Sequence, residues 1–348
     1  MNSFYDYTLS ELEEYLVSSG YKKYVAIQLY EWVYRKLVLD YESMTNISKD
    51  LRMFLKENLS LSLPDIVKKE VSSDSTVKYL FSFTDDSKVE GVLMHHPYGL
   101  SYCVSSQVGC NMGCSFCASG LRKKTRDLKA SEMISMILKS MIDSKERISH
   151  IVIMGTGEPL DNYDNVLKFI RILNIPKGLE IGIRHITLST SGLVPKIKML
   201  ADESLGINLA ISLHAPTDDL RSKLMPINKA YKIEEVLEAC DYYFKKTGRR
   251  ITFEYLLLEG VNDSILYADK LADIIKGLNA YVNLIPYNHV DEFSYKESNK
   301  KSVNTFYDQL KKRGINVTMR HKMGDDIDAA CGQLRSKALK EEEDKYEN

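Results

Sequence analysis

Four of the six cysteines lie within fifteen consecutive residues. Cys110, Cys114 and Cys117 stand in the stretch CNMGCSFC, separated by three and two residues, and Cys103 lies seven positions before Cys110. In a reducing compartment, cysteines this close together bind metal or carry out redox chemistry more often than they form structural disulfides. Structural zinc sites and ordinary iron-sulfur clusters take four protein ligands, so three thiolates leave one metal position open. The spacing predicts an inorganic centre that can bind a substrate or a cofactor.

Two kinds of centre fit this loop on spacing alone. The pattern favours an iron-sulfur cluster, because structural zinc sites usually present paired C-x2-C ligands. A zinc site that takes Cys103 or a histidine as its fourth ligand is the alternative. Gly113 would let the loop backbone wrap closely around either centre. Cys240 and Cys331 are isolated in the sequence, and an isolated cysteine is usually a small buried core residue.

The elements that must position this loop follow from the hydrophobic pattern after Cys103. Short β-branched stretches alternate with segments of helical spacing. With the strand around Cys103 they form about six β/α units, which predicts an α/β fold with a parallel sheet, either open or curled into a partial barrel. Ligands then gather at the carboxyl ends of the strands. The expected strands are 149–154, 184–189, 207–213, 250–258, 281–286 and 315–319, and the expected helices are 162–173, 195–203, 232–247, 264–277 and 301–313.

The first hundred residues follow a different pattern. Residues 8–39 carry apolar groups at helical spacing, with Thr8 as the N-cap and Glu11 three residues later. From about residue 65, short β-branched and aromatic stretches indicate a meander. We therefore expect four parts along the chain, namely a small N-terminal helical accessory domain over 1–64, a short β extension over 65–100, the α/β core over 101–336 and an acidic, disordered tail over 337–348.

Composition limits the class of protein. The chain has 348 residues, of which 44% are apolar and 27% charged, and this excludes collagen, coiled coil and wholesale disorder. No apolar run is long enough to span a bilayer, and the acidic start MNSFYDYTLSELEE lacks the core of a signal peptide. We expect a cytoplasmic protein with no membrane partner. The net charge is 47 − 48 = −1, so any nucleic-acid surface must be local.

Further motifs accompany the cysteine loop CVSSQVGCNMGCSFCASG. In order along the chain they are MGTGEPLDN, LSTSGLVP, LAISLHAP, LMPIN, FEYLLLEGVND, VNLIPYN and GDDIDAACGQL. Together they resemble the radical S-adenosylmethionine (SAM) enzymes, and more narrowly the ribosomal and transfer RNA adenine methyltransferases that act at carbon 2. The resemblance covers most of the chain. It implies a partial (β/α)6 barrel, and it implies that Cys110, Cys114 and Cys117 hold a 4Fe-4S cluster whose fourth iron binds SAM.

The resemblance also implies a chemistry. Carbon 2 of adenine lies between two ring nitrogens and is too electron-poor to attack the methyl group of SAM, so the family uses a radical route and two SAM molecules per methyl. One SAM methylates a cysteine, which matches Cys331 in AACGQL, and a radical from the second activates that methyl group. A second thiol, which matches Cys103, resolves the protein-RNA adduct by forming a disulfide. Cys103 should be partly exposed and electropositively placed, because the attack needs a thiolate.

Other site residues follow from the same resemblance. Glu90 in KVEGVLM matches the base that removes the proton from carbon 2, although a lone glutamate on a strand is more often a solvated charge. Glu158 suits the SAM ammonium group, while Gly155 and Gly157 permit close backbone approach. Strand-end polar groups that are merely satisfied would occupy similar positions. The residues expected to contact SAM are Gly157, Glu158, Ser189, Ser212, Leu213, His214 and Asn288.

The implied partners are 23S ribosomal RNA, transfer RNA and an electron donor such as a flavodoxin or ferredoxin, and we expect a monomer. The N-terminal helical domain resembles the family's accessory RNA-gripping domain, although its aromatic residues equally suit core packing. Smaller basic groups near 245–250 and 311–313 could extend an RNA surface, but charges at helix ends are usually solvated. The strip expected to bind phosphate, with a local charge of 5 − 1 = +4, comprises Arg122, Lys123, Lys124, Arg126 and Lys129 against Asp127.

Three rival interpretations remain open at this stage. The nearest is a related resistance enzyme that methylates carbon 8 of the same adenosine with the same cysteines. GEP at 157–159 and IPYN at 285–288 resemble the carbon 2 group, whereas the rival tends to carry GEA and IRYN. The second is a non-catalytic, zinc-stabilised RNA-binding protein. The third, a radical SAM enzyme with a different substrate, leaves Cys103 and Cys331 without a role.

Overall fold

The computed structural model describes residues 1–324, 326–327 and 333–347. Within them, a ten-stranded sheet has the order β14-β13-β12-β11-β10-β9-β6-β5-β4-β3. Its parallel strands are β6 (Gly99–Val104), β9 (His150–Ile153), β10 (Ile186–Thr190), β11 (Asn208–Ser212), β12 (Ile251–Leu257), β13 (Ala280–Pro286) and β14 (Val317–Met319). The alternation of strands and helices expected from the sequence is confirmed.

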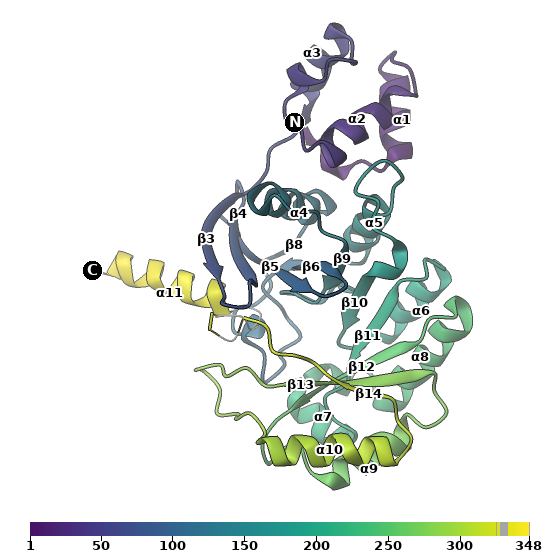
Figure 1. The fold of residues 1–348 in the computed structure, drawn as a ribbon, viewed down its shortest axis with the longest axis vertical. Helices are drawn as coiled ribbons and strands as arrows, with labels where there is room; N and C mark the ends of the chain where they lie inside the picture. The colour runs from purple at the N-terminus through teal and green to yellow at the C-terminus, as the bar shows by residue number, and fades with distance from the viewer. Residues whose placement is uncertain (325, 328–332, 348) are drawn as a thin grey trace.

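Helices lie along the outside of the curved row of parallel strands (Figure 1). Side chains divide between the two faces of each strand. On β10, Ile186 and Leu188 are buried in the hydrophobic core, whereas Ser189 on the other face lines a cavity. The helices of this layer and its connections are α4 (Ala130–Ser144), α5 (Tyr163–Leu173), α6 (Val194–Asp202), α7 (Asp218–Leu224), α8 (Ile233–Thr247), α9 (Ile265–Ile274) and α10 (Lys300–Lys312).

Helix α4 is absent from the elements that the sequence predicts. An amphipathic helix is recognised by one apolar stripe, but α4 is buried on nearly all sides. Met133, Ile134, Met136 and Ile137 are all fully buried. Lys145, with φ 59°, ends the helix in the left-handed region.

The N-terminal helices stand apart from the sheet, at the top of Figure 1. They are α1 (Leu9–Ser18), α2 (Val25–Tyr30) and α3 (Lys49–Asn58), and the pair β1 (Asn2–Ser3) and β2 (Leu59–Ser60) closes the unit. The predicted capping box is present, because Thr8 N donates to Glu11 Oε2 at 2.8 Å. A hydrogen bond of 3.0 Å from the backbone N–H of Ser131 to the side-chain Oδ1 of Asp6 joins the unit to α4.

The predicted β extension is formed by antiparallel strands β3 (Asp65–Val71), β4 (Val77–Ser82) and β5 (Lys88–His96), which continue the sheet from β6. The C-terminal segment differs from our expectation. In place of a disordered tail from residue 337, helix α11 (Gln333–Glu347) covers this segment up to residue 347. Its Lys, Glu, Leu and Ala residues are strong helix formers, and an ion pair of 2.6 Å between Lys340 and Glu292 holds it to the loop after β13.

No helix in the described part of the chain is long and apolar enough to cross a membrane.

Candidate active site

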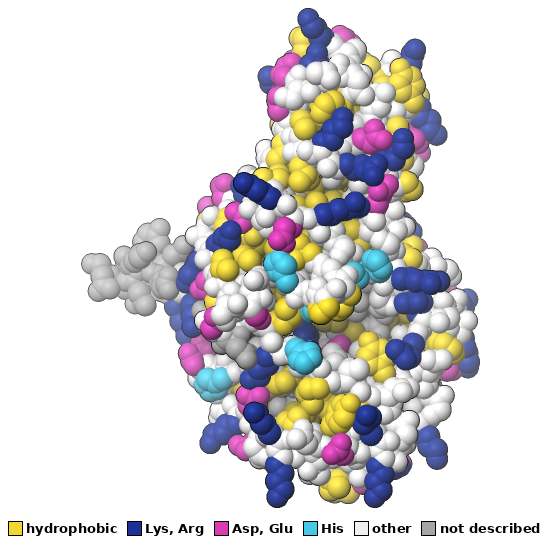
Figure 2. Space-filling view, viewed as in Figure 1, with side chains coloured by type: hydrophobic (Ala, Val, Ile, Leu, Met, Phe, Trp, Pro, Cys, Tyr) yellow, Lys and Arg dark blue, Asp and Glu magenta, His cyan; other side chains and the backbone are white. Residues whose placement is uncertain are grey.

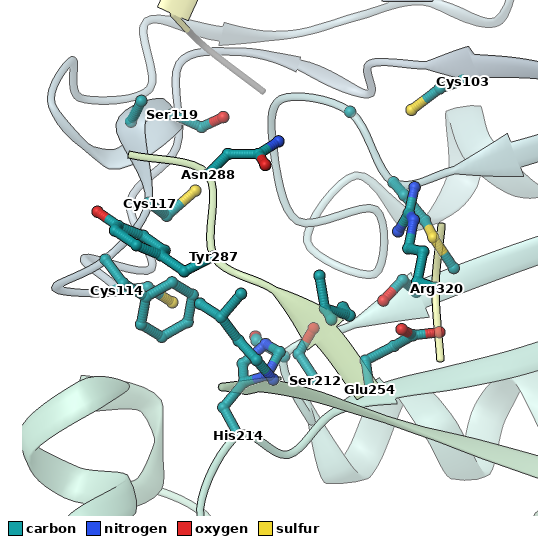
Figure 3. Close-up of a pocket in the computed structure, with 18 of the residues that line it drawn as sticks. Cys103, Cys114, Cys117, Ser119, Ser212, His214, Glu254, Tyr287, Asn288 and Arg320 are labelled. Atoms are coloured by element: carbon teal, nitrogen blue, oxygen red, sulfur yellow. The ribbon is translucent and has the colours of Figure 1, made fainter. Parts of the chain in front are cut away.

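A cavity of about 340 Å³ opens at the carboxyl ends of the parallel strands, beside the three-cysteine loop (Figure 3). Parallel α/β sheets place their ligands at this edge. The volume is in the range of small-molecule sites. The predicted site residues that line it are Cys103, Cys110, Cys114, Cys117, Gly157, Glu158, Ser189, Ser212, His214 and Asn288.

The three-cysteine loop is held at its base by a short antiparallel pair, β7 (Gln107–Val108) and β8 (Arg126–Asp127). Directly after β7, Gly109 has φ +86°, and a Cβ there would lie 2.2 Å from the carbonyl oxygen of Lys123. Only glycine fits this position. The two ends of the loop are thus drawn together, and its three cysteines line the cavity.

The glycines of the GTGEP turn pack against the segment that leads into this loop. A Cβ on Gly155 would lie 2.6 Å from Ser105 Oγ, and a Cβ on Gly157 would lie 2.6 Å from the Cβ of Gln107. The close packing of this turn against Ser105 and Gln107 therefore requires glycine at both positions. Both glycines also line the cavity, so the expected close approach of their backbone to a ligand stays a prediction.

Glu158 follows these glycines and is 3% exposed. Its Oε1 accepts a hydrogen bond from Leu160 N at 3.0 Å, and its Oε2 accepts one from Ser191 N at 2.7 Å. Burial raises the pKa of Glu158, and these bonds oppose the rise. The carboxyl group thus ties the turn after β9 to the end of β10, and it lines the cavity as a preoriented acceptor.

His214 follows β11 and has the left-handed backbone conformation, with φ 55°. Its Nδ1 accepts a hydrogen bond from Leu256 N at 3.0 Å, and its ring packs edge-on against Phe116 of the cysteine loop. Burial lowers the pKa of His214 to about 3, and the charge of Arg221 adds to the effect. The ring is therefore neutral at physiological pH, with Nε2 as its hydrogen-bond donor.

Arg221 on α7 is fully buried behind the cavity. Its guanidinium donates to the carbonyl oxygens of Leu213, Ser191 and Ser212, at 3.2, 2.6 and 3.1 Å, and to Asn228 Oδ1 at 3.1 Å. Burial lowers the pKa of Arg221 to about 10, so the group stays charged at neutral pH. It joins the carboxyl ends of β10 and β11 from behind.

The thiols of the loop are affected by this cation. Burial raises the pKa of Cys110 to about 11 and also raises the pKa of Cys114. The positive charge of Arg221 opposes the rise at Cys114. Metal binding needs thiolates, so these buried sulfurs favour a positively charged centre that compensates their deprotonation.

Cys103 and Glu90 occupy the same face of neighbouring strands. Val92 on β5 pairs in register with Cys103 on β6, and Glu90 lies two residues before Val92. Glu90 is buried, contrary to the solvated strand-face position that is usual for a lone glutamate. It forms an ion pair of 3.3 Å with buried Lys78 and accepts a hydrogen bond of 2.7 Å from Arg335 N at the start of α11.

A further polar group on the cavity wall is missed by the sequence analysis. Glu254 on β12 is 5% exposed, and its Oε2 accepts from Asn283 Nδ2 at 2.9 Å. Burial raises the pKa of Glu254, and the charge of Arg320 opposes this. Arg320 also lines the cavity (Figure 3). The signal in the sequence was a single acidic residue inside the otherwise apolar strand TFEYLLL.

Comparison with known proteins agrees with this architecture. The family model "Ribosomal RNA large subunit methyltransferase N-terminal domain" matches residues 3–61, and the "Radical SAM superfamily" model matches residues 104–271. A solved radical SAM methyltransferase from Sphaerobacter thermophilus is 44% identical and superimposes with a TM-score of 0.91, covering 96% of this chain and 99% of that one.

Two curated relatives are similar over nearly their full length. Proteins of Geobacillus kaustophilus and of Thermoanaerobacter sp. strain X514, each named a probable dual-specificity RNA methyltransferase RlmN, are 53% and 54% identical to this chain. The matches cover 98% and 97% of this chain, and 94% and 98% of the relatives. The chain belongs to the RlmN family. It is therefore a radical SAM enzyme that methylates RNA.

As a radical SAM enzyme, this RlmN family member uses a 4Fe-4S cluster and SAM. The described residues fit both. Three thiols on one closed loop can each bind a different iron of a cubane cluster and leave the fourth iron open. No three His, Cys, Asp or Glu side chains of the described chain converge on a single metal-ion position. Glu158 and neutral His214 place a hydrogen-bond acceptor and a donor on the adjoining wall of the cavity.

Three sequence-based expectations for this RlmN family member need correction, stay predictions or lie outside the structure. Cys103 is 6% exposed, so it is not partly exposed, although it lines the cavity. The side chain of Leu213 is buried in the hydrophobic core, on the opposite face from Ser212, so the predicted contact of Leu213 with SAM stays a prediction that only its backbone could satisfy. Cys331, the residue expected to carry the methyl group, lies outside the described residues.

Two of the five bases in the strip expected to bind RNA phosphates are paired with carboxylates. Lys124 forms ion pairs with Asp161 and Asp127, at 2.7 and 3.2 Å. Arg126 forms ion pairs with Asp85 and Glu132, at 2.7 and 2.8 Å. Asp85 and Asp161 are far from the strip in sequence, so counting charges in a sequence window overestimated its charge.

Proposed function

We propose that this RlmN family enzyme methylates carbon 2 of an adenosine in 23S ribosomal RNA, at the equivalent of A2503, and an adenosine in some transfer RNAs. When bound, the cluster and SAM supply the radical chemistry that this electron-poor carbon requires. One observation carries the proposal. Cys103, the thiol expected to release the product, lines the same cavity as Cys110, Cys114 and Cys117 (Figure 3).

Three residues of the chain each take part in a different step of the reaction. Cys331 carries the methyl group, Glu90 accepts the proton from carbon 2, and the Cys103 thiol releases the RNA by forming a disulfide with Cys331. Support for Glu90 comes from its position on the same face as Cys103 and from its buried contacts, which fix the carboxylate. Glu158, Ser189, Ser212, His214 and Asn288 orient SAM from the cavity wall.

The remaining parts of the chain have supporting roles in this proposal. Residues 1–64 grip the RNA, in line with the ribosomal RNA methyltransferase model that matches residues 3–61. A flavodoxin or ferredoxin reduces the cluster, and the enzyme works as a monomer. The carbon 8 rival differs only in which adenine carbon receives the methyl group, and the motifs GEP and IPYN favour carbon 2.

The test is mass spectrometry of nucleosides from ribosomal RNA treated with the cluster-reconstituted enzyme. We expect 2-methyladenosine from the natural chain and none from Cys331→Ala. Cys103→Ala should retain a covalent protein-RNA adduct that migrates as one species in a denaturing gel. Appearance of 8-methyladenosine would favour the rival, and absence of methylated RNA despite an intact cluster and SAM cleavage would overturn the substrate assignment.

A further inference from the structure

Four side chains form a continuous series of rings, which we call the ring ladder: His96, Tyr98, His150 and His185. The rings of His150 and His185 stack with centroids 4.2 Å apart and 18° between their planes. Those of His96 and Tyr98 stack at 4.7 Å and 7°. Tyr98 meets His150 edge-on at 5.0 Å, which connects the two stacks.

The ring ladder lies at the amino ends of β6, β9 and β10, opposite the edge that carries the cysteine loop. His96 ends β5, His150 begins β9, and His185 directly precedes β10. The cavity extends toward the ladder without including it: Met94, which lies two residues before His96 on the same face of β5, lines the cavity, whereas the four ladder residues do not. Four residues of extended strand, about 13 Å, separate Gly99 at the start of β6 from Cys103. A few nucleotides of single-stranded RNA span this distance.

Local backbone structure builds the ladder. Gly99, in the turn between β5 and β6, has φ +134°, and a Cβ there would lie 2.5 Å from Ser149 Oγ. Glycine is therefore needed to bring Tyr98 against β9. Ser149 Oγ in turn hydrogen bonds with His150 Nδ1 at 2.9 Å, which fixes the plane of that ring.

The ladder is exposed to solvent at Tyr98 and His185 and half-buried at His96 and His150. Tyr98 is 65% exposed, whereas Tyr102, on the next strand, is fully buried. Histidines gather around a hollow on this face of the molecule (Figure 2). Burial lowers the pKa of His96 and of His150, which keeps these rings neutral at physiological pH. The exposed ring of Tyr98, stacked on the ring of His96, is suited to stack on a nucleobase.

Positive charge borders the rings. The charge of Arg320 reaches both His96 and Tyr98, and Arg320 also lines the cavity. Arg184, exposed, directly precedes His185. Such cations beside stacking rings match a single-stranded nucleic acid, which offers bases and phosphates together.

We propose that the ring ladder stacks an unpaired base of the substrate RNA next to the target adenosine, while Arg320 contacts the RNA backbone. The proposal rests on the RNA methyltransferase function above and adds a recognition surface outside the SAM and cluster site. It commits to RNA as the occupant, because RNA is the substrate of the family and because Arg320, whose charge acts on His96 and Tyr98, also lines the cavity that would hold the target adenosine.

The test compares Tyr98→Ala with Tyr98→Phe in the full-length, cluster-reconstituted enzyme, using a ribosomal RNA hairpin that contains the target adenosine. Loss of one stacking ring should raise KM for this RNA about tenfold for Tyr98→Ala, whereas Tyr98→Phe should stay near the natural value. SAM cleavage without RNA, measured as 5'-deoxyadenosine, should be unchanged in both. Leu266→Ala, a similarly exposed position on α9, is the matched control and should change neither quantity.

A second arm replaces single nucleotides beside the target adenosine by abasic ones. If the ladder stacks a base, one abasic RNA should raise KM for the natural enzyme and remove the difference between it and Tyr98→Ala. An unchanged KM in Tyr98→Ala, with normal cluster content, would overturn the proposal. If the natural enzyme methylates no RNA at all, the proposed function fails instead, so the two failures are distinguishable.

Discussion

The side chains at the two ends of the barrel wall differ in their burial and in their bonding partners. At the carboxyl ends of the strands, polar groups are buried and fixed by the protein: Arg221 bonds to carbonyl oxygens, and Glu158 accepts backbone N–H groups. At the amino ends of β6 and β9, the rings of the ladder are exposed or half-buried and contact one another. The first arrangement suits chemistry, which needs preoriented groups in a dry site. The second suits recognition of a long substrate. Substitutions at the two ends should therefore differ strongly in their effect on stability.

The largest effect is expected at Arg221. Arg221→Met leaves several buried carbonyl oxygens without their donor, and we expect the free energy of unfolding to fall by about 3–5 kcal/mol. Urea unfolding measures this. The matched control is Arg313→Met, which removes a solvent-accessible arginine paired with Asp269 and Asp273 and should change stability far less. Equal losses in both variants would contradict the contrast between the two ends.

A smaller loss is expected at Gly157. Gly157→Ala would force a Cβ to 2.6 Å from Gln107 Cβ at φ +112°, so we expect a loss of about 3 kcal/mol and a displaced cysteine loop. Gly260→Ala, at φ +67° with nothing within 4 Å of its added Cβ, should lose only about 1 kcal/mol from backbone strain. Thermal unfolding and iron content of the reconstituted proteins check both effects. A Gly157→Ala protein with normal stability and iron content would show that the turn can shift freely.

Replacement of Glu254 should raise the free energy of unfolding, whereas the two substitutions above lower it. Burial raises the pKa of Glu254, so ionisation in the folded state costs stability, and this cost grows as pH rises above the ordinary pKa of a glutamate. Glu254→Gln keeps an oxygen for Asn283, so we expect a gain of about 1 kcal/mol at pH 8 that shrinks toward pH 4. Urea unfolding at both pH values measures the gain. Exposed Glu297→Gln is the control, and a less stable Glu254→Gln at pH 8 would show that Arg320 outweighs burial.

The smallest effect on stability is expected at the ring ladder. Tyr98 is 65% exposed, so Tyr98→Ala should change the free energy of unfolding by less than about 0.5 kcal/mol. The same variant is the one expected to weaken RNA use. If its stability falls by several kcal/mol in thermal unfolding, the ladder is a structural cluster and the contrast between the two ends is lost.

Much of the fold could be predicted because strands and helices differ in hydrophobic period. The expected strands and outer helices after Cys103 agree with the structure, and so does the β extension. Helix α4 was missed because its burial on nearly all sides removes the apolar stripe on which recognition depends. The acidic composition suggested disorder after residue 337, but the helix-forming residues of α11 prevail there.

The residues of the candidate site could be predicted where they belong to a recognisable sequence motif. Cysteine spacing and strand-end motifs identified residues that line the cavity, since parallel strands bring their carboxyl ends to one edge. The burial of the Leu213 side chain was not foreseen, because one residue along a strand reverses the face. The sequence analysis did not identify Arg221 and Glu254, because nothing in the local sequence shows that a charged residue will be buried.

The sequence by itself determined the α/β order, the three-cysteine loop and the family, because these depend on local period and on ordered motifs. Only the tertiary structure decided which charged side chains are available to bind a partner and which are paired within the protein. Lys124 and Arg126 are paired with Asp161 and Asp85 from distant parts of the chain. The ring ladder likewise joins residues from 96 to 185 that no sequence window contains. Contacts between remote segments set burial and pairing, and burial and pairing set what each side chain can do.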